Sequence, residues 1–131
     1  MGNLQAYMPT DATITVGTAT AGSFPVVVQL LGPNGEDMNV SACVFAYLSK
    51  DSAGATICVD GTDTTSLAAG TDGLMVEAAG YATAVSGHFV SETDGDIDIT
   101  AIVLTTKTMY LNVVLPNGRL VTSAIMTYTA E

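Results

Sequence analysis

The chain has no tryptophan, a single histidine, His88, and two cysteines, Cys43 and Cys58, in 131 residues. Without tryptophan, a sugar-stacking platform would rest on tyrosine or phenylalanine alone, which disfavours a glycosidase or a carbohydrate-binding module. Two cysteines are too few for a secreted disulfide scaffold and fit a reduced compartment. A Cys–His nucleophile needs a cysteine beside His88 and a third, orienting group. Because the spacing indicates neither, we predict no catalytic residue and no enzyme.

Basic residues are almost absent. Lys50, Lys107 and Arg119 face thirteen acidic residues, which gives a formal net charge of −10. Binding to nucleic acid through its phosphates needs clustered Lys and Arg, and so does binding to an anionic membrane surface. The charge balance therefore excludes both partners.

Long apolar runs are absent as well. A membrane-spanning helix needs about 20 consecutive apolar residues, and the longest runs here, such as Pro25–Val28, are a few residues long. Residues 1–9 contain neither a basic stretch nor an apolar segment of the kind found in secretory signals. We therefore expect synthesis in the cytoplasm without a signal peptide.

Charged residues of either sign make up 12% of the chain, about half the usual share. A surface with so few charges must expose Thr, Ser, Gly, Ala and some apolar area. Large exposed apolar patches usually mark contact surfaces, so we expect other subunits to cover part of this surface. The alternative is a Thr-rich β-surface kept soluble by its acidic residues alone.

What the chain does have is a series of turn signals between β-prone segments. Asn-Gly or Asp-Gly pairs, which suit hairpin turns, occur at positions 34–35, 60–61, 72–73, 94–95 and 117–118. The segments between them are rich in Val, Ile, Thr, Tyr and Phe. They predict strands near 12–17, 25–31, 40–48, 55–59, 73–78, 81–91, 96–103, 108–115 and 119–128. Ser66–Ala69, ended by Gly70, is the one place where a single helical turn is the alternative, so we predict one all-β domain.

The last hairpin has the clearest turn. Pro116 and Gly118 fit a three-residue loop with a bulge. Pairing across this loop places Val113 opposite Val121 and, further on, Met109 opposite Ile125. With Leu111 these residues form a core face, while the opposite face carries Tyr110, Asn112 and Thr122.

The 40–48 strand is apolar on both faces, which is typical of a strand covered on both sides. One face carries Val44, Ala46 and Leu48, and the other carries Cys43, Phe45 and Tyr47. Cys43 and Cys58 are explained as small buried residues on strands. A disulfide between them in an oxidising medium is the alternative.

Asp94, Asp96 and Asp98 form a D-x-D-x-D run that resembles the start of a calcium loop. An EF-hand needs Gly at the sixth position and Glu at the twelfth, where this chain has Ile99 and Thr105. Alternation with isoleucines instead indicates a strand with one wet face. Asp60, Asp63 and Asp72 lie in Gly/Thr-rich sequence and are interpreted as turn formers. No metal site and no cofactor site is predicted.

Two stretches carry a resemblance to a known family. One is Pro33–Met38 followed by Val40–Ser49, and the other is Ser91–Thr100 followed by Met109–Arg119. Their strand and turn pattern, over roughly residues 25–128, resembles Ig-like modules of bacterial and phage surface proteins. It is similar to small structural proteins of tailed-phage virions, including head decoration or cement proteins.

This resemblance implies a single antiparallel Ig-like β-sandwich over residues 25–131, preceded by an arm and first strand over 1–24. It implies a non-enzymatic protein on the capsid surface that binds the major capsid protein and neighbouring copies of itself, as a homo-oligomer or a chain ordered only in the assembled particle. The expected interface residues are Leu4, Tyr7, Met8, Phe24, Phe45 and Tyr47. Two alternatives remain open, a tail, fibre or cell-surface adhesion module that binds host glycan or protein, and a small enzyme built on a sandwich.

Overall fold

The computed structural model describes residues 8–57, 66–76, 85–103 and 106–129. Within these ranges the chain forms strands and no helix, so no described helix could span a membrane. The strands are β1 (Asp11–Val16), β2 (Ser23–Leu31), β3 (Cys43–Ser49), β4 (Ser66–Ala69), β5 (Leu74–Val76), β6 (Ser86–Val90), β7 (Asp96–Ile102), β8 (Lys107–Val114), β9 (Leu120–Thr122) and β10 (Met126–Tyr128). The prediction of an all-β chain is confirmed.

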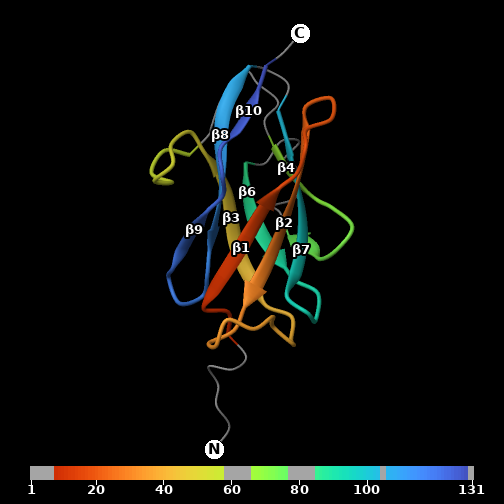
Figure 1. Cartoon of the computed structure of the whole chain (residues 1–131), viewed down its shortest axis with the longest axis vertical. Helices are drawn as coiled ribbons and strands as arrows, with labels where there is room; N and C mark the ends of the chain where they lie inside the picture. Colours follow the sequence, from red (N-terminus) through yellow and green to blue (C-terminus); the bar gives the residue numbers. More distant parts are fainter. Residues whose placement is uncertain (1–7, 58–65, 77–84, 104–105, 130–131) are drawn as a thin grey trace, which may run out of the picture.

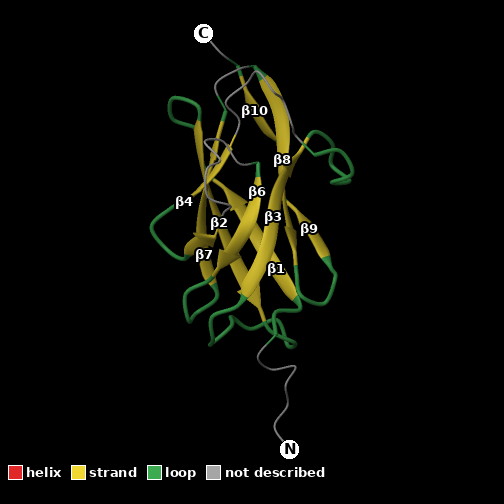
Figure 2. Cartoon of the chain, turned by 180° about the vertical axis from the view of Figure 1, so that it is seen from behind, coloured by secondary structure: helices red, strands yellow, loops and turns green. Residues whose placement is uncertain are grey.

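Two antiparallel sheets face each other in a sandwich. One has the strand order β1-β2-β7-β4, and the other has the order β10-β8-β3-β6-β5 with β9 also paired to β8. In Figure 1 the first sheet lies in front of the second, and Figure 2 shows the second sheet from its own side. Neighbouring strands such as β2 and β7 are far apart in sequence, so the core is closed by non-local pairing.

Alternation of apolar residues builds the core between the sheets. Side chains of successive strand residues point to opposite faces, and in β2 every second residue from Phe24 to Leu30 is buried. The same alternation buries Ile97 and Ile99 of β7 and the aromatic ring of Phe89 in β6. Val44, Ala46 and Leu48 of β3 are buried as well, so this face of β3 is core as predicted.

β1 belongs to the sandwich. It pairs with β2 from Asp11 opposite Leu31 to Val16 opposite Val26, and Ala12 is part of the core. The sandwich therefore begins at Asp11 in the structure.

Residues 66–69 are a strand, and the alternative of a helical turn is wrong. Ser66 to Ala69 pair with β7 from Ile102 to Ile99, with Leu67 buried in the core. Four residues gain more from a place at the sheet edge than from one isolated helical turn, which is costly to nucleate.

The C-terminal segment is two strands where one was predicted. The turn is confirmed, because Leu115 N–H donates to Arg119 O at 2.9 Å and Val113 lies opposite Val121. Beyond that point Met109 lies opposite Met126, so the predicted pairing with Ile125 is wrong by one residue. A bulge causes the shift: Ser123 N–H donates to Leu111 O at 2.8 Å, and Leu111 N–H donates to Ser123 Oγ at 2.9 Å.

Candidate functional site

The outward surface of the six-stranded sheet is the candidate interaction site. Two rows of side chains cross it, as the register of β5, β6, β3, β8 and β9 shows. We call these eight residues the outer apolar face. The first row is Leu74, Val90 and Cys43, and the second row is Val76, His88, Phe45, Val114 and Leu120.

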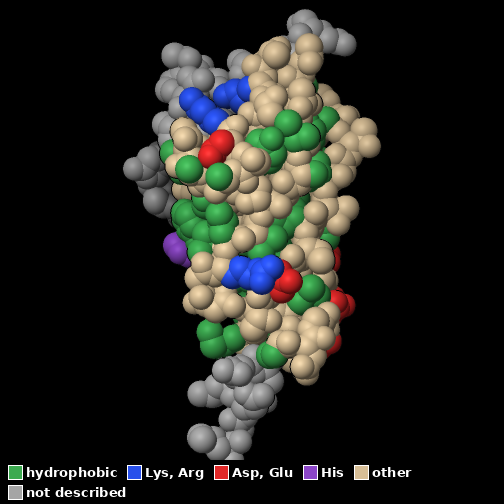
Figure 3. Space-filling model, turned by 60° about the vertical axis from the view of Figure 1, so that its left-hand side comes forward, with side chains coloured by type: hydrophobic (Ala, Val, Ile, Leu, Met, Phe, Trp, Pro, Cys, Tyr) green, Lys and Arg blue, Asp and Glu red, His purple; other side chains and the backbone are tan. Residues whose placement is uncertain are grey.

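Much of the outer apolar face is open to solvent. Leu74 is 59% exposed and Val76 52% exposed, and Leu120 and Cys43 are exposed as well. Neighbouring strands lie about 4.8 Å apart, so the five residues of the second row span roughly 19 Å. Neither row contains a charged residue. Figure 3 shows hydrophobic side chains gathered beside the chain's one histidine.

Aromatic contacts order the middle of this face. The Phe45 ring lies 5.3 Å from the His88 ring and 5.9 Å from the Tyr47 ring, measured between centroids. Both pairs are tilted, in the distance range that favours aromatic contact. Phe45 is therefore held in place before any partner arrives.

The loop over residues 50–57 covers one end of the sheet surface, beside the second row. The Tyr47 hydroxyl donates to Gly54 O at 2.6 Å. The Asp51 carboxylate accepts from Thr56 N–H at 3.0 Å and from Ala55 N–H at 3.1 Å. These bonds, Thr56 first, hold the pKa of Asp51 below its usual value, against a smaller effect of burial. The Tyr47 hydroxyl is thus bonded within the chain, while its ring lies half-buried on the outward side of β3.

The predicted interface residues differ in their exposure to solvent. Phe45 and Tyr47 lie half-buried on the outward side of β3, and Met8 is exposed. Phe24 lies in the core and is 5% exposed, so little of its side chain is open to a partner. Leu4 and Tyr7 lie outside the described residues. Sequence reasoning missed the exposed edge residues Leu74 and Val76, because a three-residue strand gives almost no alternation signal.

The arrangement of His88 and Cys43 gives no catalytic pair among the described residues. Both lie on the outer apolar face, since Cys43 pairs with Val90 and His88 pairs with Phe45. The imidazole contacts the Phe45 ring, and no hydrogen bond joins it to the thiol. Cys58 lies outside the described residues.

A second feature lies on the opposite sheet. Asp72, Asp96 and Asp98 each place one carboxylate oxygen so that these atoms lie within 4.8 Å of one another. Burial first, then a side-chain contact with Asp72 and the charge of Asp98, raise the pKa of Asp96 to about 6. Contact with the Asp72 carboxyl also raises the pKa of Glu92. We call Asp72, Asp96 and Asp98 the acidic cluster.

The acidic cluster joins one residue of the β4–β5 loop to two residues of β7. Asp72, interpreted from the sequence as a turn former, lies in that loop, and its N–H donates to Asp98 Oδ2 at 3.2 Å. Asp94 instead caps its own turn, with its Oδ1 accepting from Asp96 N–H at 3.2 Å. The set that converges is therefore not the consecutive D-x-D-x-D run. Asp60 and Asp63 lie outside the described residues.

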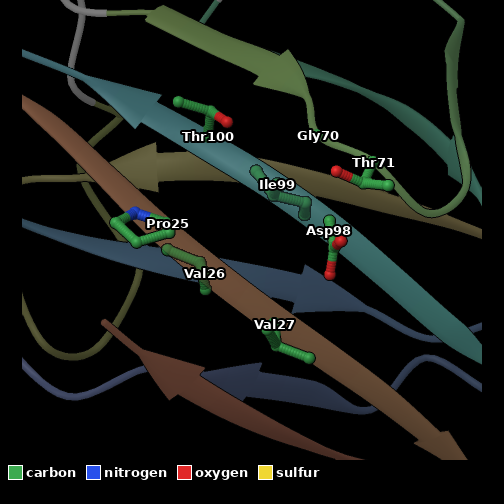
Figure 4. A pocket seen from close by; sticks show the side chains of 8 residues that line it. All are labelled: Pro25, Val26, Val27, Gly70, Thr71, Asp98, Ile99 and Thr100. Carbon is green, nitrogen blue, oxygen red and sulfur yellow. The ribbon is translucent and has the colours of Figure 1, made fainter. Parts of the chain in front are cut away.

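A shallow groove of about 220 Å³ lies beside the acidic cluster on the outer side of the four-stranded sheet. Figure 4 shows its lining, which is Pro25, Val26, Val27, Gly70, Thr71, Asp98, Ile99 and Thr100. Asp98 belongs to both features and is the one charged residue in the groove. The groove has no pair of groups placed for acid–base chemistry.

Comparison with known proteins adds little. No protein-family model and no curated protein matches the chain. Among solved structures it is similar to a cohesin module from a family 33 glycoside hydrolase of Clostridium perfringens ATCC13124. The TM-score is 0.40 at 9% identity, over 95% of this chain and 96% of that chain.

Proposed function

We propose that this chain is a non-enzymatic structural protein that binds other proteins through its outer apolar face, as a decoration or cement protein on a capsid. The observation that carries the proposal is an uncharged, solvent-exposed apolar surface on a chain with a net charge of −10. Large exposed apolar patches usually mark contact surfaces.

The distribution of charge supports a protein partner. Neither row carries a charge, so a partner can cover the outer apolar face without desolvating a charged side chain. Desolvation costs several kcal/mol per ion. Acidic residues gather on the other sheet instead, where Glu92 and Asp94 lie next to the acidic cluster in sequence. Negative charge there disfavours nucleic acid and leaves the apolar rows as the binding surface.

A capsid is favoured as the partner by the resemblance of residues 25–128 to virion decoration proteins. Many identical copies on a symmetric shell would each cover this face against the major capsid protein or a neighbouring copy. A standard interface buries about 800 Å² per partner. Contacts therefore have to extend beyond the two rows, and Met8, which is exposed, is one candidate.

Fractionation of virus particles tests the location. A decoration protein is expected to sediment with DNA-filled heads in hundreds of copies per particle, counted by quantitative mass spectrometry. Recovery in tail fractions at low copy would replace the proposal with a fibre or adhesion module. Absence from every particle fraction would refute both.

A matched pair of variants tests the surface. Val76→Asp places a charge in the second row, whereas Ile125→Asp places the same charge on an equally exposed aliphatic residue, 54% against 52%, outside both rows. We expect Val76→Asp to weaken rebinding to stripped heads by at least about tenfold, since burying an unpaired charge costs more than 1.4 kcal/mol. Ile125→Asp should bind like the unaltered chain. Equal binding by both variants would rule out this face.

The proposal that the chain is not an enzyme has its own test. The purified chain should turn over neither glycan nor ester substrates. Turnover that disappears in His88→Ala would show an enzyme.

A further inference from the structure

Two strands and a loop bring three carboxylates to one place. Asp96 and Asp98 alternate with buried Ile97 in β7, so both side chains leave the outer side of the four-stranded sheet. The loop after β4 runs alongside β7, because Asp98 N–H donates to Asp72 O at 2.8 Å and Asp72 N–H donates to Asp98 Oδ2 at 3.2 Å. The backbone therefore fixes the third carboxylate beside the other two.

An independent observation points to a missing partner in this group of carboxylates. Asp96 Oδ1 is buried and accepts no hydrogen bond, alone among the buried side-chain oxygens and nitrogens of the described residues. A buried polar atom without a partner is unfavourable and calls for an explanation, such as an ion. No ion pair within the described ranges brings a lysine or arginine to the cluster, since Arg119 pairs with Asp11 at 3.5 Å.

The donor set selects the class of ion. Three carboxylates without sulfur or imidazole suit hard cations such as calcium and magnesium. Two oxygens on opposite sides of a calcium ion, at about 2.4 Å each, are about 4.8 Å apart. The three oxygens lie within 4.8 Å of one another, a separation that a calcium ion can bridge. Calcium accepts several carboxylates in flexible geometry, whereas magnesium demands near-octahedral geometry and is usually bound through one or two carboxylates.

We propose that Asp72, Asp96 and Asp98 bind one calcium ion on the outer side of the four-stranded sheet. Calcium takes six to eight oxygen ligands, and the groove at Asp98 leaves room for water molecules to complete the shell. The bound ion supplies the missing partner of Asp96 and joins the β4–β5 loop to β7.

The position of the site gives it a second effect. Asp72 lies two residues before Leu74, the first residue of β5 and of the outer apolar face. Holding Asp72 therefore also holds the edge strand that carries Leu74 and Val76. The calcium site itself does not depend on the proposed function.

Calorimetric titration of the chelator-treated chain with calcium chloride tests the site, alongside thermal unfolding with and without calcium. We expect one calcium per chain, a higher Tm with calcium, and weaker binding of magnesium. Asp96→Asn and Asp72→Asn should each lower calcium affinity at least about tenfold, because affinity follows the number of charged ligands. Asp37→Asn removes one exposed negative charge elsewhere and should bind as the unaltered chain does.

Several results would overturn the proposal. One is the absence of calcium binding at millimolar concentration. Another is equal loss of affinity in Asp37→Asn, which would show only a general effect of net charge. Unchanged affinity in both cluster variants would place the ion elsewhere. Should one cluster variant fail to fold, as judged by circular dichroism, the other decides, because Asp72 lies in a loop and Asp96 in a strand.

Discussion

Asn112 offers the sharpest test of how the 50–57 loop is seated on the six-stranded sheet. It points outward from β8, yet it is fully buried, because the loop covers it. Its Nδ2 donates to Ser49 Oγ at 2.7 Å, and its Oδ1 accepts from the Thr122 hydroxyl at 2.7 Å. Asn112→Ala removes both bonds and leaves buried Ser49 Oγ without its donor.

The size of the effect follows from these bonds. Each is worth about 1 kcal/mol net, and a buried oxygen left without its donor adds about 1 kcal/mol. We therefore expect Asn112→Ala to lower the free energy of unfolding by roughly 2–3 kcal/mol, with an unchanged m-value in urea. Thr122→Val keeps the side chain's shape but loses the hydroxyl, so it should cost about 1 kcal/mol.

A double-mutant cycle separates the contact from the background. Asn112→Ala combined with Thr122→Val should cost less than the two single changes together, since the variants share one hydrogen bond. A loss below about 0.5 kcal/mol in Asn112→Ala would show that water already satisfies these groups. The loop would then not be seated over Asn112, and this polar side chain would be open to solvent.

Three other predictions concern the bulge, a turn and the acidic cluster. Ser123→Ala removes the oxygen that accepts a buried β8 N–H, so urea unfolding should show a loss of about 1–2 kcal/mol, and an unchanged midpoint would mean that the bulge closes without it. Gly73→Ala should lower the free energy of unfolding more than Gly35→Ala in the same assay. Both glycines have positive φ, but only at Gly73 would a Cβ meet backbone, at 2.9 Å. Equal losses of stability would contradict this close approach. In chelator, the contribution of Asp96 to stability should fall as pH rises from about 4 to about 6, because the folded chain binds this proton more tightly, with a pKa of about 6 against 3.8. Unfolding midpoints across that range should lose this slope in Asp96→Asn, and an identical slope in the variant would assign it to other carboxylates.

Local patterns predicted much of the fold. Alternating apolar residues indicated β2, β3, β7 and β8, and the Pro116–Gly118 turn indicated the register of Val113 with Val121. The predicted register of this hairpin is wrong beyond Ser123, where the Ser123 hydroxyl accepts the hydrogen bond from Leu111 N–H in place of a backbone carbonyl. Ile125 and Met126 are both apolar, so the pattern could not decide which one faces Met109, and the Ser123 hydroxyl settled it.

The candidate sites were harder to predict because both depend on strand order. Phe45 was expected at an interface from the two apolar faces of its own strand, but its partners in the row, Val76 and Leu120, come from β5 and β9.

The acidic cluster is a stronger case, since Asp72 lies 26 positions from Asp98. The D-x-D-x-D spacing drew attention to Asp94, which bonds to its own turn. The neighbouring loop decides which carboxylates come together. Alternate residues of one strand share a face, but they cannot surround an ion without a ligand from a second segment. A calcium site on a sheet therefore needs a donor that no local spacing specifies, and here the pairing of β4 with β7 provides it.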